Sequence, residues 1–252
     1  HHQAIRDSGW SGKVIPCFRP DAVFRIALPG WRGEIDKLTS ASGVSVSDYT
    51  SFVQALEERR AFFRSLGATA TDHAVLQPYT ERLPDAEADR LFQRALRGEA
   101  TGEDQSRFEA HMLMEMARMS TEDGMVMQIH PGSLRDHNRV IFERFGQDKG
   151  CDIPLPTEYT RNLQALLNAY GNDSDFRLVL FTLDEASYSR ELAPLAGHYP
   201  AVDVLESKSR VRDHLLDATE RTAANALLRT EAAYREKEDL IAVGAYQKGA
   251  DP

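Results

Sequence analysis

The sequence predicts an α/β fold in which a parallel sheet with helical crossovers is followed by a helical carboxy-terminal appendage. Over the first 205 residues, short apolar runs of strand length alternate with amphipathic helical patterns. Strands that are apolar on both faces and separated by helices are typical of a parallel sheet with right-handed crossovers. Residues 208–240 carry no strand or turn signals and are rich in Ala, Leu, Glu and Arg, which indicates one or two exposed amphipathic helices. We therefore expect two units, at residues 1–205 and 206–252.

About five strands are expected, each an apolar run bounded by polar or turn residues. The clearest is 176–181, which is apolar apart from Arg177; the others are at 13–18, 67–71, 125–130 and 199–205. A closed β/α barrel needs eight strands, so the sheet is expected to have two open edges. Because open edges favour pairing, we expect the appendage to cover an edge or the chain to form a homo-oligomer.

Helices are expected between these strands. The helix over 47–67 begins at Ser47, a favourable N-cap, and stops at Gly67, a favourable residue just past a helix end. Residues 1–9 resemble the end of a helix stopped by Gly9, so the chain is expected to begin within a domain. The remaining helices are expected at 84–97, at 103–119, from about Asn138 onward, and at 157–170.

Composition excludes several classes of protein. The 252 residues are 42% hydrophobic and 27% charged, as in ordinary globular proteins, and the net charge of −9 disfavours nucleic acid as a partner. No apolar run reaches the ~18 residues of a membrane span. The two cysteines, Cys17 and Cys151, lack metal or disulfide spacing, which favours reduced thiols in a cytoplasmic protein. The six methionines lie between residues 112 and 127, where core packing is favoured over a cofactor contact.

The most informative functional signal is a strand that ends in a histidine. The mostly apolar run 125–130 ends at His130, a Pro-Gly pair then stops the strand, and Arg135 and His137 follow in the next few residues. In α/β proteins the functional groups stand where parallel strands end, so the sequence indicates a site here. A lone histidine is often structural, and that alternative stays open.

Three further strand ends carry polar residues. Arg19 follows the first run and suits an anionic substrate, because a guanidinium binds a carboxylate through two hydrogen bonds; a surface arginine that caps the next helical region is the alternative. Asp72 and His73 follow the second run, and His73 could share a rim with His130. Asp184 follows the run at 176–181, where a helix N-cap explains it without catalysis.

Several common motifs are absent from the sequence. It contains no phosphate-binding loop, no dinucleotide fingerprint and no nucleophile elbow. It also contains neither a His-x-His nor a His-Glu-x-x-His pair, so His130 lacks the close histidine partner that metal sites usually have.

At these strand ends the chain resembles a known family. Three segments in this order, VIPCFRPD at 14–21, TDHA at 71–74 and MQIHPGSLR at 127–135, are similar to the central part of the uronate (glucuronate) isomerases of the amidohydrolase superfamily. The resemblance covers residues 1–202. It implies an incomplete parallel (β/α) barrel and a sugar-acid substrate, since the family interconverts aldo- and keto-hexuronates such as D-glucuronate and D-fructuronate.

The resemblance also implies roles for individual residues. His130 would be the catalytic group and the ligand of a divalent metal, zinc or manganese. Arg19 would bind the substrate carboxylate, and His73, Arg135 and His137 would contact its hydroxyls. The family has a His-x-His motif on its first strand and an Asp on its last, and neither is present here. We therefore expect a metal bound weakly or not at all, and turnover near zero.

The final residues resemble a second family. The runs HYPAVDVLES at 198–207 and YREKEDLIAVGAY at 234–246 are similar to the carboxy-terminal piece of the flagellar and type III secretion ATPases. The hexapeptide GHYPAV at 197–202 suits both families, so the chain resembles a chimera joined there. The alternative function is accordingly a non-catalytic binding or scaffold module that uses the carboxy-terminal helices.

If the chain has the site that the resemblance to uronate isomerases implies, the positions of its residues can be predicted. Because carboxyl ends of parallel strands share one rim, Arg19, His73 and His130 should converge on one cleft. That cleft should be wider and wetter than an enzyme pocket.

Overall fold

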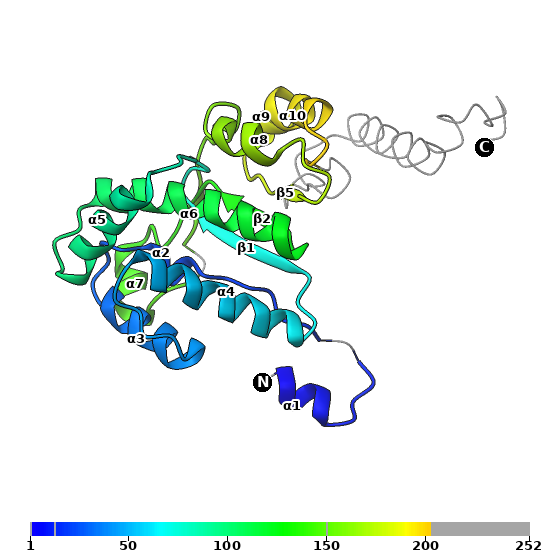
Figure 1. Ribbon diagram of the computed structural model, residues 1–252. Helices are drawn as coiled ribbons and strands as arrows, with labels where there is room; N and C mark the ends of the chain where they lie inside the picture. Colours follow the sequence, from blue (N-terminus) through cyan, green and yellow to red (C-terminus); the bar gives the residue numbers. More distant parts are fainter. Residues whose placement is uncertain (1, 13, 150, 203–252) are drawn as a thin grey trace.

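A computed structural model of the chain describes residues 2–12, 14–149 and 151–202 (Figure 1). The helices expected at 208–240 lie outside the described residues. No helix within the described ranges is both long enough and apolar enough to cross a membrane. In chain order the elements are α1 (His2–Asp7), α2 (Asp21–Phe24), α3 (Trp31–Ser42), α4 (Tyr49–Ser65), β1 (Ala70–Val75), α5 (Asp85–Leu96), α6 (Gly102–Asp123), β2 (Val126–Pro131), β3 (Ser133–Leu134), α7 (Arg139–Phe145), β4 (Ile153–Pro154), α8 (Gln164–Tyr170), β5 (Leu178–Leu180), α9 (Glu185–Ser187), the π-helical turn η1 (Tyr188–Leu192) and α10 (Ala193–His198).

The main sheet is parallel, as predicted, and has three strands in the order β1-β2-β5. Its register places His130 opposite Ala74 and Ile129 opposite Leu180. Single parallel bridges extend it on both sides, from Phe18 to Thr71 and from Val202 to Leu178. The five predicted strand regions therefore lie side by side in chain order, although the two outer ones contribute one bridge each among the described residues.

The predicted helices are present as α1 and as α4 to α8, several of them with shifted ends. Helix α4 is capped by Asp48 rather than by the predicted Ser47, because the Asp48 carboxylate accepts the Ser51 N–H at 2.8 Å. Strand β1 starts at residue 70 rather than 67, because the Gly67 and Ala68 N–H groups still donate to carbonyls of the last turn of α4, those of Arg64 and Phe63. Helix α8 starts at 164 rather than 157, because the Glu191 carboxylate takes the N–H groups of residues 159 and 160.

Other elements are not evident from the sequence pattern. Helix α3 buries Trp31, Ile35 and Leu38 directly after a Pro-Gly turn that conceals its start. A two-stranded antiparallel sheet, β3 with β4, was also not predicted. It flanks α7, which is the helix predicted from about Asn138 and which Asn138 caps. We call residues 133–154 the arm. None of the residues of α7 is buried, so this helix of the arm contributes no side chain to the core.

Strict alternation in the central strands separates two environments. Met127 and Ile129 of β2 are fully buried beneath the helices, whereas His130 is on the opposite face and partly exposed. Helices α4 and α6 run along the sheet in Figure 1. All six methionines are buried apolar side chains, and five of them belong to one continuous core cluster. The expectation that the methionines are core residues is thus confirmed.

A buried ion pair joins α4 to the end of α6. The Arg60 side chain is only 2% exposed and donates to both carboxylate oxygens of Asp123, at 2.9 and 3.0 Å, and to the Ser120 hydroxyl at 3.1 Å. A buried cation that loses its partner is far more destabilising than a broken surface pair.

We expect Asp123→Asn to lower the free energy of unfolding by about 3 kcal/mol, because it leaves Arg60 buried without a counter-charge. Urea unfolding followed by circular dichroism measures this. Asp36→Asn, which affects an exposed pair with Arg32, is the matched control and should change stability by less than about 0.5 kcal/mol. The double variant Arg60→Met/Asp123→Asn should be more stable than Asp123→Asn, and the reverse order would contradict the interpretation.

Candidate functional site

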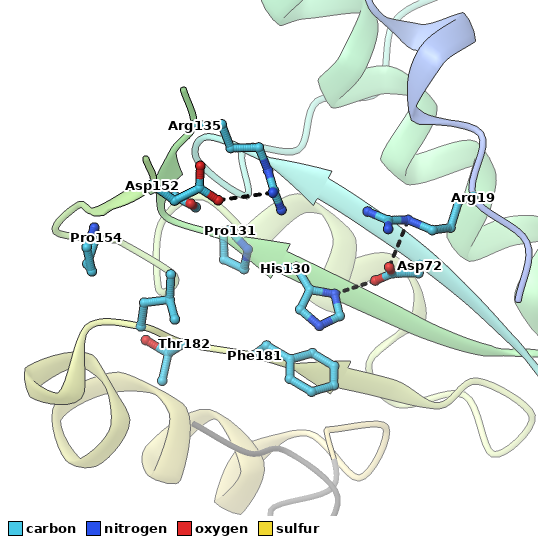
Figure 2. A pocket seen from close by; sticks show the side chains of 11 residues that line it. Arg19, Asp72, His130, Pro131, Arg135, Asp152, Pro154, Phe181 and Thr182 are labelled. Carbon is cyan, nitrogen blue, oxygen red and sulfur yellow. Dashed lines mark hydrogen bonds and ion pairs between the residues drawn. The ribbon is translucent and has the colours of Figure 1, made fainter. Parts of the chain in front are cut away.

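A cavity of about 310 Å³ opens at the carboxyl ends of β1, β2 and β5 (Figure 2). Its lining residues come from three strand ends, the segment before α2 and the arm. They are Arg19, Asp72, His130, Pro131, Ser133, Arg135, Asp152, Pro154, Phe181, Thr182 and Leu183. The cavity thus lies where the sequence predicted a site.

The chain turns sharply beyond His130 because of Gly132. This residue has a φ of +83°, and a Cβ there would be 2.2 Å from the Thr157 hydroxyl oxygen. Only glycine accommodates both the left-handed backbone and the close approach. The turn directs the chain into the arm, which brings Arg135 and Asp152 to the cavity wall.

The Asp72 carboxylate is shared by two cationic or donor groups. One of its oxygens accepts from Nδ1 of His130, and the other pairs with Nε of Arg19 at 2.9 Å. An ionised carboxylate only accepts hydrogen bonds, so Nδ1 of His130 carries a proton. Nε2 of the ring has no hydrogen-bond partner among the described residues and is the acceptor when the imidazole is neutral.

Opposing effects act on the pKa of Asp72. Burial alone would raise the pKa, but the hydrogen bond from His130 and the positive charges of His130 and Arg19 outweigh it and hold the pKa of this carboxyl below its usual value. Asp72 is therefore ionised at neutral pH and fixes the tautomer of His130.

Phe181 fixes the plane of the His130 ring. The two rings stack with their centroids 3.8 Å apart and an interplanar angle of 14°. The Phe181 backbone is held on both sides, since its N–H donates to the Ile129 carbonyl at 3.0 Å and its carbonyl accepts from the Tyr159 hydroxyl at 2.8 Å. His130 is thus oriented by Asp72 at one nitrogen and by Phe181 across one face.

Arg135 stands on the wall formed by the arm. Its guanidinium pairs with Asp152 at 3.2 Å and with Asp148 at 3.4 Å. Figure 2 shows it across the cavity from Arg19, with His130 between the two. Two guanidinium groups therefore face one cavity that also holds an oriented imidazole.

Two predicted site residues lie elsewhere, which corrects the expected convergence of Arg19, His73 and His130 on one cleft. His73 is on the other face of β1, is 1% exposed, and stacks on the Phe24 ring, because alternation turns it away from Asp72. His137 is exposed on the arm and does not line the cavity; its N–H donates to the Cys151 carbonyl.

The sequence interpretation passed over three residues that line the cavity. Asp72 was passed over for its neighbour His73, and strand alternation places the two side chains on opposite faces of β1. Phe181 carried only a strand signal, and Asp152 carried none. Asp184 accepts from the Ala186 N–H and the Ser187 hydroxyl at the start of α9, as expected of a helix cap.

The described residues do not fit a metal ion. Within the described ranges, no three side chains of His, Cys, Asp or Glu are grouped closely enough to hold one. At the predicted ligand, His130, one ring nitrogen is already used by Asp72, and a single remaining nitrogen does not make a zinc site with the usual three or four protein ligands.

Fold and site together define an α/β protein whose polar groups meet at the carboxyl ends of successive parallel strands. The family model for glucuronate isomerase matches residues 1–208, and the chain belongs to that family. The model for the T3SS EscN ATPase C-terminal domain matches residues 216–252, so the two predicted resemblances are confirmed.

Individual relatives agree with this. Over 202 residues the chain is 54% identical to a uronate isomerase of Nostoc punctiforme and 51% identical to one of Xanthomonas campestris pv. campestris, which covers 80% of this chain and 43% of each relative. The crystal structure of glucuronate isomerase from Caulobacter crescentus superposes with a TM-score of 0.77 at 46% identity, over 83% of this chain and 43% of that one. Uronate isomerase from Thermotoga maritima gives 0.75 at 27%, over 80% and 44%. The chain thus spans less than half the length of these relatives.

Burial lowers the pKa of His73 to about 3. The unfolded chain protonates this residue below about pH 6.5, whereas the folded protein keeps it neutral. The free energy of unfolding should therefore fall as the pH drops below 6.5, by up to about 1.4 kcal/mol per pH unit for each such histidine.

We expect His73→Leu to reduce this fall, measured by urea unfolding at pH 7, 6 and 5. Part of the fall should remain, since burial also lowers the pKa of His111 to about 4. His137→Gln, which changes an exposed imidazole outside the cavity, is the matched control. An unchanged pH slope in His73→Leu would contradict a neutral buried role for this residue.

Proposed function

We propose that residues 1–205 form part of a hexuronate isomerase: an incomplete (β/α) barrel that binds a sugar acid, with residues 206–252 as a helical appendage. The observation that carries this proposal is the Asp72–His130 pair set between two arginines in a cavity of about 310 Å³. The family match supports it, since the matched relatives are named uronate isomerases. D-Glucuronate and D-fructuronate are the proposed substrate pair.

His130 suits the proton transfer that such a reaction needs. An aldose–ketose isomerisation moves a proton between adjacent carbons through an enediol, with a base near the operating pH and a cation to stabilise the developing oxyanion. Asp72 holds the Nδ1 proton, so Nε2 of the neutral ring accepts the substrate proton. The resulting imidazolium is stabilised by the adjacent Asp72 carboxylate.

The arginines suit the anionic group and the hydroxyls of a sugar acid. Arg19 uses Nε on Asp72, and its terminal N–H groups can bind the substrate carboxylate. Arg135 lies on the opposite wall and would donate to hydroxyl oxygens. His73 and His137 have no part in this proposal because neither lines the cavity.

We expect the chain to bind D-glucuronate more tightly than D-glucose, measured by isothermal titration calorimetry or by ligand-observed NMR. Arg19→Gln should weaken glucuronate binding by about tenfold, or about 1.4 kcal/mol, and remove the preference for the charged sugar. Arg135→Gln should weaken both sugars alike. Arg139→Gln, an exposed arm residue outside the cavity, is the matched control.

Two outcomes would count against the roles assigned to the two arginines. Equal binding of the charged and neutral sugars would contradict carboxylate recognition. Loss of the preference only in Arg135→Gln would mean that Arg135, not Arg19, binds the carboxylate.

Turnover should stay near background when the chain is given glucuronate with zinc or manganese, because the His-x-His and last-strand Asp motifs are absent. Ketose formation that His130→Ala abolishes would contradict that last expectation.

The match of residues 216–252 to a secretion ATPase domain supports a second candidate, a non-catalytic scaffold function of the appendage. An apolar stripe is expected there from Leu215, Leu216, Ala223, Leu227 and Leu228, which lie outside the described residues. We expect size-exclusion chromatography with light scattering to show a homo-oligomer of the full chain. A strict monomer in which this face is buried against its own barrel would contradict partner docking through this stripe.

A further inference from the structure

The parallel ladder on the outer side of β1 stops beside the site. The Phe18 N–H donates to the Ala70 carbonyl at 3.2 Å, and the Asp72 N–H donates to the Phe18 carbonyl at 2.9 Å. In a regular parallel ladder, the Ala74 N–H would next donate to the carbonyl of residue 20. That residue is Pro20, whose carbonyl instead accepts the Val23 N–H at 3.0 Å as α2 begins.

The Asp21 carboxylate takes the place of the missing ladder acceptor. It accepts the Ala74 N–H at 3.2 and 3.3 Å through its two oxygens. Ala74 is the residue of β1 that stands opposite His130 in the register. Asp21 therefore secures the strand end directly beside the proposed base.

The same carboxylate holds Arg19. One oxygen of Asp21 lies 3.4 Å from a terminal nitrogen of Arg19, while Nε of Arg19 pairs with Asp72. Arg19 is half exposed, with a side chain that water would otherwise let rotate, whereas the Asp21 side chain is 15% exposed and anchored to the backbone. A fixed carboxylate on each side leaves the guanidinium little freedom to turn.

We propose that Asp21 is a positioning residue: it anchors the end of β1 through Ala74 and aligns Arg19 across Asp72 for the substrate carboxylate. This rests on the proposed function in that Arg19 is taken as the carboxylate-binding group. Asp21 does not line the cavity, so it acts on a ligand through Arg19 rather than by contact. Alignment before binding improves affinity because less side-chain freedom is lost when the ligand binds.

A double-mutant cycle tests the action through Arg19. Asp21→Asn keeps an oxygen acceptor for Ala74 but removes the negative charge that holds the guanidinium. The dissociation constant for D-glucuronate should rise about fivefold in Asp21→Asn when Arg19 is present, and by less than twofold in the Arg19→Gln background. Equal changes in both backgrounds, or no change in either, would overturn the proposal. Asp36→Asn is the matched control, since it also removes a carboxylate that pairs with an arginine, and neither partner lines the cavity.

Amide exchange tests the anchor without any ligand. The Ala74 N–H should exchange with solvent at least tenfold faster in Asp21→Ala and within about threefold of the wild-type rate in Asp21→Asn. The Met127 amide of the buried strand, whose N–H donates to the Arg177 carbonyl, should keep its rate in both variants and so reports on global unfolding. An unchanged Ala74 rate in Asp21→Ala would overturn the anchoring role.

The binding and exchange experiments together distinguish a failure of this proposal from a failure of the proposed function. If the unmodified chain does not bind glucuronate, the proposed function fails, and the Asp21 proposal is decided by Ala74 exchange together with the Arg19 Nε–H signal in ¹⁵N NMR. That signal should exchange faster in Asp21→Asn than in the unmodified chain. A signal equally protected in both would overturn the alignment of Arg19 by Asp21.

Discussion

Parallel pairing of β1 with β2 is the constraint on which the rest of the described structure depends. The register sets Ala74 beside His130 and Asp72 beside Gln128, and alternation then decides which side chains reach the cavity and which enter the core. One face receives Asp72 and His130, while the other receives His73, Met127 and Ile129 under the helices. A slip of one residue would exchange the two sets, so the buried apolar face fixes the polar one.

Much of the fold was predictable because the spacing of apolar residues along the sequence is periodic in its strands and helices. Strands β1, β2 and β5 and helices α4, α5 and α6 lie close to the predicted ranges, since apolar spacing distinguishes a strand from a helix. Their ends moved where side chains from distant elements supplied caps, as Glu191 does for residues 159 and 160. Helix α3 was not predicted because the Pro-Gly turn before Trp31 conceals its start.

The site was predictable in part for a related reason. Arg19, His130 and Arg135 were found because each follows a strand end, and the structure brings these three to one cavity. The choice of His73 over Asp72 turned on a single position, and the start of a strand cannot be read from sequence to that precision. Phe181 and Asp152 reach the cavity only through the tertiary arrangement of β5 and the arm, which no local pattern encodes.

The stacking of Phe181 on His130 has a consequence for how the site comes into being during synthesis. Asp72 and His130 are 58 positions apart, and the ring that completes their arrangement belongs to residue 181. Contacts of such long sequence separation form late, because the intervening chain must first be ordered. A nascent chain in which β5 has not yet been synthesised therefore contains His130 and Asp72 but lacks the Phe181 ring that fixes the plane of the imidazole. The geometry of this cavity is thus a property of the assembled sheet, and it cannot help to nucleate the fold.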